Sequence, residues 1–150
     1  KMFDVNRSPG LSELIIKKAT FDTAIKKTDI KNLSILPSGN IPPNPSELIG
    51  SQKMSDLVKE LSKKYDKIFF DAPPVLAVTD PILIGRLVDG LFLVARSELT
   101  DLELIKHTLE TIKNTKTPLI GGIINGVTSK TLLYGKYYHY YHYHYKYKYE

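Results

Sequence analysis

Apolar residues gather in short continuous runs at intervals along this chain. The runs at 67–71 (KIFFD), 91–95 (LFLVA) and 119–125 (LIGGIIN) contain almost no polar interruption. Runs of this kind are typical of strands that are buried on both faces of a parallel sheet. A shorter strand is expected at 33–36, because the turn residues PSG follow it.

Helical patterns separate these runs. Residues 51–64 are expected to form a helix with one apolar stripe, made of Met54, Leu57, Val58 and Leu61. A second helix opens at Thr100, which forms a predicted capping box with Glu103, and its apolar side carries Leu102, Ile105, Leu109 and Ile112. Shorter helices are expected at 12–18, 21–27 (with Thr20 as N-cap), 46–50 and 80–88. The alternation of strand and helix predicts an α/β fold with a parallel sheet.

Length and composition narrow the protein class. The chain has 150 residues, 42% of them hydrophobic, which suits one domain with a buried core. It has no cysteine, which excludes a disulfide scaffold and thiolate metal sites. No apolar stretch approaches the roughly 20 residues that cross a bilayer. The first residues, KMFD, resemble neither a signal peptide nor a natural N-terminus, so the chain is expected to begin within a domain.

The net charge of +5 has two interpretations. Clustered lysines attract phosphates, which would make a surface for an anionic partner. Lysines also neighbour acids along the predicted helices, as at 59–60 (KE) and 63–66 (KKYD), which is typical of solvated helix surface. The sequence favours the second interpretation and predicts lysine–acid pairs there.

The last stretch of the chain differs from the rest. Nine of the ten tyrosines lie in residues 134–150, which contain no aliphatic residue. A segment without aliphatic residues has little with which to build a core, so we expect a disordered tail. The predicted organisation is therefore a domain at 1–133 followed by a tyrosine-rich tail at 134–150.

The tail admits several functions. Its alternating tyrosines at 143–149 suit a strand, and His139, His142 and His144 could hold a metal or, with neighbouring lysines, contact nucleic acid. Phosphorylation explains the number of phenols better than either. The tail carries three lysines and one glutamate, and each phosphate adds about −1.5 to −2 charges, so two modifications would reverse its charge.

One carboxylate stands where an α/β protein binds ligands. Asp71 ends a predicted strand, and ligands of open parallel sheets bind outside the carboxyl ends of the strands. A carboxylate there holds Mg²⁺ in P-loop ATPases. The alternative is an acid that merely ends a strand. Arg96 also follows a strand, either as a phosphate contact or as an ordinary surface arginine.

Several motifs together resemble the bacterial tyrosine kinases of capsule and exopolysaccharide synthesis. The run 69–80 (FFDAPPVLAVTD) is similar to their extended Walker B region, and 36–51 (LPSGNIPPNPSELIGS) to the segment that precedes it. Residues 8–14 and 88–100 resemble neighbouring stretches of the family. The tyrosine-rich C-terminus resembles its autophosphorylation cluster.

The resemblance implies a P-loop NTPase-like parallel sheet flanked by helices, with its N-terminal strands missing, and transfer of phosphate from ATP to tyrosine. Asp71 would bind Mg²⁺. Asn125 would contact adenine, although Asn-Gly is also a common turn, and both readings stay open. The implied phospho-acceptors are Tyr137, Tyr138, Tyr140, Tyr141, Tyr143, Tyr145, Tyr147 and Tyr149.

The chain departs from the family in two respects: it has neither the Gly-rich Walker A loop nor the second strand ending in acids, which the resemblance would imply for Mg²⁺ binding and for activating the substrate phenol. No G-x-x-x-x-G-K-[ST] motif occurs in the 150 residues, so the phosphate-cradling loop has no counterpart and no catalytic residue is assigned. We therefore expect the chain alone to be inactive. Two rival functions remain: a non-catalytic phospho-acceptor or pseudokinase fragment, and a partition-type Walker ATPase, in which the tyrosine cluster would not be expected.

The resemblance also implies partners. These are a membrane-embedded regulator of polysaccharide chain length, further copies of the kinase in a ring with phosphorylation in trans, and a cognate tyrosine phosphatase. Nucleic acid is not expected as a partner. The implied location is cytoplasmic, at the inner face of the plasma membrane.

Overall fold

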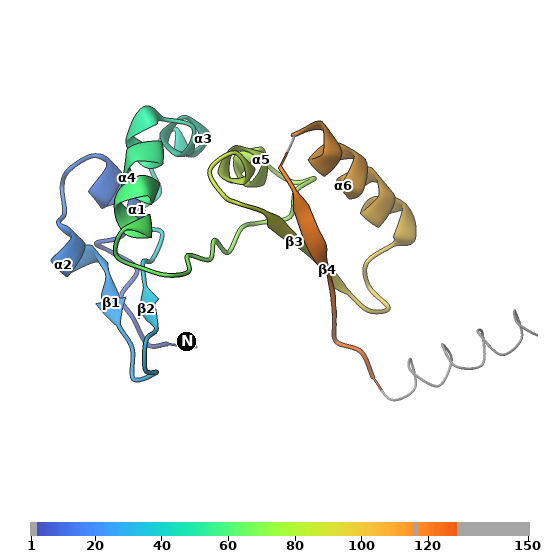
Figure 1. Ribbon diagram of the computed structural model, residues 1–150, viewed down its shortest axis with the longest axis horizontal. Coiled ribbons are helices and arrows are strands. Elements are labelled where there is room, and N and C mark those ends of the chain that lie inside the picture. The colour runs from blue at the N-terminus through green and yellow to red at the C-terminus, as the bar shows by residue number, and fades with distance from the viewer. Residues whose placement is uncertain (1–2, 116, 129–150) are drawn as a thin grey trace, which may run out of the picture. The chain divides into compact units, whose positions relative to one another are not determined.

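The computed structural model describes residues 3–115 and 117–128, which fall into two compact units (Figure 1). Unit 1 is Lys1–Leu87 and unit 2 is Val88–Glu150. The predicted boundary between residues 133 and 134, and the whole predicted tail, lie outside the described residues.

The core of unit 1 is built on α4 (Gln52–Ser62). The helix begins where the Ser51 hydroxyl accepts a hydrogen bond from the backbone N–H of Met54 at 3.2 Å. Met54, Leu57 and Leu61 are buried against Ile15 of α1 (Leu11–Ile15), and Val58 packs beside them. The predicted apolar stripe is therefore confirmed, because its spacing of three and four residues puts these side chains on one face.

Two predicted helices in unit 1 end earlier than expected. The helix predicted at 12–18 ends at Ile15, and Lys17 has a positive φ of 59°. The helix predicted at 21–27 stops after one turn, α2 (Phe21–Ala24), with Thr20 confirmed as its N-cap. The prediction for 26–27 was wrong because these residues form β1 (Lys26–Lys27), which pairs antiparallel with β2 (Ser34–Ile35). Partner strands override a weak local helix preference.

Two short helices complete the unit. α3 (Pro45–Ile49) and α5 (Asp80–Gly85) both have a proline in their first turn, where a missing N–H costs nothing. Both were predicted, and α5 is shorter than expected. They contact each other within unit 1.

The strand predicted at 67–71 is not formed. The segment carries no backbone hydrogen bond to another described residue, so it is not part of a sheet. Its side chains nevertheless alternate as in an extended chain. Ile68 and Phe70 pack against the core of unit 1, while Phe69 is 84% exposed. The apolar run therefore has one buried side instead of two, because no neighbouring strand pairs with it.

Unit 2 is a β–α–β unit. β3 (Leu91–Arg96) and β4 (Leu119–Asn125) are parallel and hydrogen-bonded to each other, and α6 (Leu102–Asn114) connects them (Figure 1). Val94 is in register with Ile123, and Arg96 with Asn125. The predicted parallel pairing is confirmed for these two strands.

Three details of unit 2 differ from prediction. The strands are not buried on both faces: alternate residues of β3 and nearly all of β4 are exposed in a sheet of two strands. The N-cap of α6 is Asp101, whose carboxylate accepts from the N–H of Glu103 at 2.9 Å, whereas the Thr100 hydroxyl accepts from the N–H of Arg96 at 2.9 Å. The inward side of α6 carries Thr108 and Ile112, while Leu102 is 63% exposed.

Within the described ranges, no helix combines the length and the apolar character that crossing a membrane requires.

Candidate functional site

Asp71 lies at the end of the extended segment of unit 1. It is exposed, and it shares the outward side of that segment with Phe69 because alternate residues of an extended chain point the same way. Its carboxylate accepts no hydrogen bond and forms no ion pair with another residue that the structure describes. The carboxylate is therefore free to bind a cation.

The segment that follows Asp71 is fixed at its far end. The Ser46 hydroxyl of α3 donates a 2.7 Å hydrogen bond to the carboxylate of Asp80, the first residue of α5. The Thr79 hydroxyl lies 3.3 Å from the Ser46 hydroxyl. No pattern in the sequence predicted this polar cluster, which connects 36–51 to 69–80, the two segments that carry the family resemblance.

A second polar cluster holds the N-terminal part of unit 1. The Glu13 carboxylate accepts hydrogen bonds from the backbone N–H groups of Gly10 at 2.8 Å and Asn40 at 3.0 Å, and from the Asn40 side-chain amide at 2.8 Å. The Gly10 N–H first, and the Asn40 N–H second, lower the pKa of the Glu13 carboxyl from an ordinary 4.5 to about 2. The Ser12 hydroxyl contacts the backbone oxygens of Ser38 and Asn40 at 2.9 and 2.7 Å.

The same cluster requires glycine at its centre. Gly39 has a φ of +81°, and a Cβ there would lie 2.2 Å from Glu13 Oε2 and 2.3 Å from Ser12 Oγ. Gly39 was expected only as a turn residue, and no local pattern in the sequence indicated the cluster. Its function is structural, since it clamps residues 10–13 to the turn at 37–40.

In unit 2, two polar side chains follow adjacent strands. Asn125 ends β4 and Arg96 ends β3, in register with each other. Carboxyl ends of parallel strands are where ligands of open α/β sheets bind. The Asn125 side-chain oxygen accepts from the N–H of Gly126 at 2.8 Å, and Gly126 has a φ of +69°, so the turn predicted at Asn-Gly is present. The turn uses the Asn125 side-chain oxygen and leaves its amide N–H₂ without a partner among the described residues, so the turn does not conflict with the adenine contact, which stays a prediction.

The predicted ligand-binding residues lie in different units. Asp71 belongs to unit 1 and Asn125 to unit 2, so neither unit alone contains both. The described ranges contain no group of three or more His, Cys, Asp or Glu residues suited to a metal. One carboxylate nevertheless fits Mg²⁺ bound with a nucleotide, because Mg²⁺ keeps several waters and takes one or two carboxylates together with phosphate oxygens.

The predicted pairing of lysines with acids was wrong. The only ion pair among the described residues joins Lys106 to Glu103 on α6 at 2.7 Å, and the lysines of α4 form none. Residues adjacent in sequence on a helix point in different directions, so lysine and glutamate at 59–60 do not face each other. The lysines of α4 are exposed, as the interpretation as solvated helix surface expects, and they form no ion pair with a described residue.

The proposed phospho-acceptors and the tail histidines lie outside the described residues. Tyr134 lies outside them as well. Tyr65 is the one tyrosine within the described ranges, and it packs against the core cluster of unit 1.

Comparison with known proteins identifies relatives over most of the chain. No family model matches. The chain is 38% identical over 136 residues to the tyrosine-protein kinase YwqD of Bacillus subtilis, an alignment that covers 90% of this chain and 57% of YwqD. The chain thus spans somewhat more than half the length of this curated relative.

Solved structures agree with this relationship. The chimerical protein CapA2B2 superposes with a TM-score of 0.82 and 34% identity, over 85% of this chain and 57% of that one. The kinase domain of the Escherichia coli tyrosine kinase ETK superposes with a TM-score of 0.78 and 31% identity, over 83% of this chain and 49% of that domain. The fold is accordingly that of these kinase domains.

Proposed function

We propose that this chain, which is similar over most of its length to bacterial tyrosine-protein kinases, contributes a Mg²⁺ ligand and the acceptor tyrosines to ATP-dependent tyrosine phosphorylation. The observation that carries the proposal is the combination of the family relationship with an unpartnered carboxylate, Asp71, at the end of its extended segment. The resemblance further implies that the reaction serves capsule or exopolysaccharide assembly.

The proposed reaction transfers the γ-phosphoryl group of ATP to a tyrosine. The bond between the γ-phosphorus and the β,γ-bridging oxygen breaks, a bond between the phenol oxygen and that phosphorus forms, and the phenol proton is released, which leaves ADP and phosphotyrosine. Bound Mg²⁺ would neutralise charge on the phosphate oxygens. Asp71 would hold the ion, and the Ser46–Asp80 contact would keep the segment after Asp71 in place.

The test of Asp71 uses a kinase that also contains a phosphate-binding loop. Asp71→Asn keeps the size of the side chain and removes the charge, so we expect tyrosine phosphorylation to fall at least about 100-fold, since metal stabilisation of transferred phosphate contributes several kcal/mol. Asp66→Asn, at another exposed position of unit 1, is the matched control. Full activity of Asp71→Asn across a Mg²⁺ titration would refute the assignment.

A non-catalytic acceptor is a second candidate, favoured by the absence of a phosphate-binding motif in these 150 residues. Both candidates predict that the 150-residue chain alone binds little nucleotide, and they differ in whether a longer protein that contains it binds Mg-ATP. Calorimetry of the 150-residue chain with Mg-ATP is expected to show no binding in the micromolar range, since backbone N–H groups of that loop supply most phosphate contacts. Micromolar affinity would place a complete nucleotide site within this chain.

The acceptors we propose are the tail tyrosines, Tyr137 to Tyr149. Tyr65 packs against the core and is a poor alternative, because a kinase must reach the phenol oxygen. Mass spectrometry after incubation with an active kinase of the family tests this. Changing the tail tyrosines to Phe should remove most of the incorporated phosphate and leave ATP hydrolysis by the complete kinase unchanged. Phosphate found only on Tyr65 would exclude the tail.

The partners are proposed from the resemblance alone. They are a membrane-embedded chain-length regulator, other copies of the chain in a ring, and a tyrosine phosphatase, at the inner face of the plasma membrane. Co-purification of the complete protein with its regulator from membranes, with sizing of the assembly before and after phosphatase treatment, tests them together. Recovery only as a monomer, without the regulator, would contradict them.

A further inference from the structure

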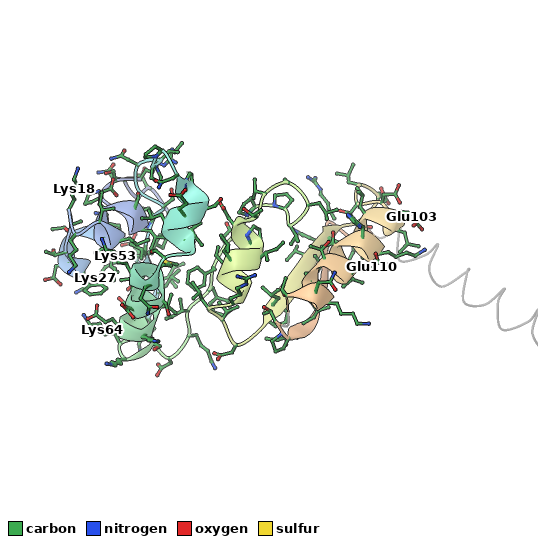
Figure 2. The ribbon with its side chains drawn as sticks, turned by 90° about the horizontal axis from the view of Figure 1, so that it is seen from above. Lys18, Lys27, Lys53, Lys64, Glu103 and Glu110 are labelled. Atoms are coloured by element: carbon green, nitrogen blue, oxygen red, sulfur yellow. The ribbon has the colours of Figure 1, made fainter. Side chains whose placement is uncertain are left out.

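Four lysines gather on one side of unit 1, and we call this surface the lysine face. Its members are Lys18, Lys27, Lys53 and Lys64 (Figure 2). Lys18 follows α1, Lys27 belongs to β1, and the other two lie near the two ends of α4. The face is therefore assembled from three separate parts of unit 1 and is not a single charged helix.

No described carboxylate forms an ion pair with the lysine face. All four side chains are exposed. The Asp56 carboxylate on α4 accepts a 2.9 Å hydrogen bond from the side-chain amide of Gln52. The Lys64 ammonium lies 4.1 Å from the centre of the Phe21 ring, which holds one charge in place by a cation–π contact.

The partner must be anionic at several separated points. Lysine ammonium groups are point charges that bind phosphate without the planar geometry of arginine. The four charges come from three parts of unit 1, and two of them lie near opposite ends of α4, so one small anion cannot engage all of them. α4 exposes no large apolar side chain, whereas Ile16 near Lys18 is 44% exposed and Ile30 near Lys27 is 56% exposed. Helices that bind a membrane surface carry a broad apolar face beside their lysines, and the part of the lysine face on α4 has none. A phosphorylated peptide is therefore the partner we argue for, and lipid binding is an outcome that would overturn it.

The chain itself contains a segment of this description. Residues 134–150 hold nine tyrosines, and those at 143, 145, 147 and 149 alternate. Phosphates on alternate residues of an extended chain are spaced by roughly 7 Å. Each adds about −1.5 to −2 charges. Unphosphorylated, the segment has more lysines than acids and would be repelled by the lysine face.

We propose that the lysine face binds the phosphorylated tyrosine-rich segment, residues 134–150, of this chain. The proposal rests on the proposed function, because that function supplies the phosphates. It adds a consequence: phosphorylation creates a ligand for unit 1, so the modification changes how the segment and unit 1 associate as well as the charge of the segment.

The test measures fluorescence anisotropy of a labelled synthetic peptide of residues 134–150 with the full, phosphatase-treated chain. The peptide carrying phosphotyrosine at 143, 145, 147 and 149 should bind at least about tenfold more tightly than the unmodified peptide, as expected for several exposed ionic contacts. Lys27→Gln with Lys64→Gln should weaken its binding by about fivefold. The matched pair Lys106→Gln and Lys113→Gln, on α6, should leave it unchanged.

The other outcomes overturn either the proposal or the proposed function on which it rests. Equal affinity of the chain for the two peptides would show that the phosphates are not recognised. An equal loss of affinity in the Lys106→Gln, Lys113→Gln variant would show that the lysine face is not the specific binding site. If the lysine-face pair reduces sedimentation with anionic phosphatidylserine vesicles while the phosphopeptide does not bind, the surface serves a membrane. The phosphates are synthetic, so peptide binding without phosphorylation of the segment in cells would refute the proposed function and leave the lysine face standing.

Discussion

The Glu13 carboxylate accepts two hydrogen bonds from Asn40, one from its backbone N–H at 3.0 Å and one from its side-chain amide at 2.8 Å. Together with the Gly10 N–H they lower the pKa of Glu13 to about 2. A carboxyl whose pKa is lower in the folded protein stabilises it above the unfolded pKa, near 4.5, and loses this contribution as the pH falls toward 2.

We therefore expect the melting temperature to fall between pH 4.5 and 2, and Glu13→Gln to remove the part of this fall that is due to Glu13. The variant should also melt below the unmodified chain at pH 7. Glu47→Gln is the matched control, because Glu47 occupies the same place in α3 but is exposed and bonds only to the Asn44 side chain. Circular dichroism gives the melting temperature of each variant across this pH range. If the melting temperatures of the two variants depended on pH in the same way, Glu13 would not be the source of the effect.

Replacement of Gly39 by alanine should destabilise unit 1. The positive φ disfavours any side chain, and the Cβ would collide with Glu13 and Ser12. We expect a loss of about 1–3 kcal/mol in the free energy of unfolding. Gly121→Ala is the control, since its Cβ would meet only the Phe92 ring at 3.8 Å. Urea unfolding compares them, and a Gly39→Ala variant as stable as the control would show that the turn is not held by the cluster.

Loss of the Ser46 hydroxyl should weaken the contact between α3 and α5. Ser46→Ala removes the 2.7 Å hydrogen bond to Asp80, at an expected cost of about 1 kcal/mol. Ser62→Ala removes only a bond from the Ser62 hydroxyl to the Lys59 carbonyl within α4 and should change stability little. Both are measured by urea unfolding. Equal effects would mean that the Ser46–Asp80 contact adds nothing.

The sheet of unit 2 should promote self-association of the chain. Val94 is 58% exposed and in register with Ile123, which is 48% exposed, and Phe92 is 52% exposed on the same strand face. Exposed apolar faces and unpaired strand edges associate. Sedimentation of Val94→Lys should show less association than the unmodified chain, whereas Leu99→Lys, in the loop after β3, should show no change. Similar behaviour of both variants would exclude the sheet.

Local patterns predicted α4 and the ends of β4 well. The sequence inside each element is sufficient to indicate it: α4 has the stripe of Met54, Leu57 and Leu61, and β4 has the apolar run at 119–125. They failed at 26–27, where a partner strand decides the conformation, and at 67–71, where none is present. Asp71 and Asn125 were placed at the ends of apolar runs, and the structure puts Asn125 at the end of β4. The roles of both residues stay predictions.

The two polar clusters were beyond local reasoning because their partners are far apart in sequence: Glu13 meets Asn40, and Ser46 meets Asp80. One sequence signal was available. The tetrapeptide Ser-Glu-Leu-Ile occurs at 12–15 and again at 46–49, and both copies open a helix. In each copy the serine hydroxyl donates a hydrogen bond to a residue outside its own helix.

The extended segment 67–71 has a consequence for how the chain exchanges its amide protons with solvent. Its N–H groups bond to no described residue, whereas those inside α4 are bonded within a helix that buries Met54 and Leu61. Amides exchange only when unbonded and open to water. The amides of α4 should therefore exchange only as fast as unit 1 unfolds. The amides of 67–71 should exchange at a rate close to that of an unfolded peptide. If another strand paired with this segment, the first sign would be slower amide exchange at these five residues.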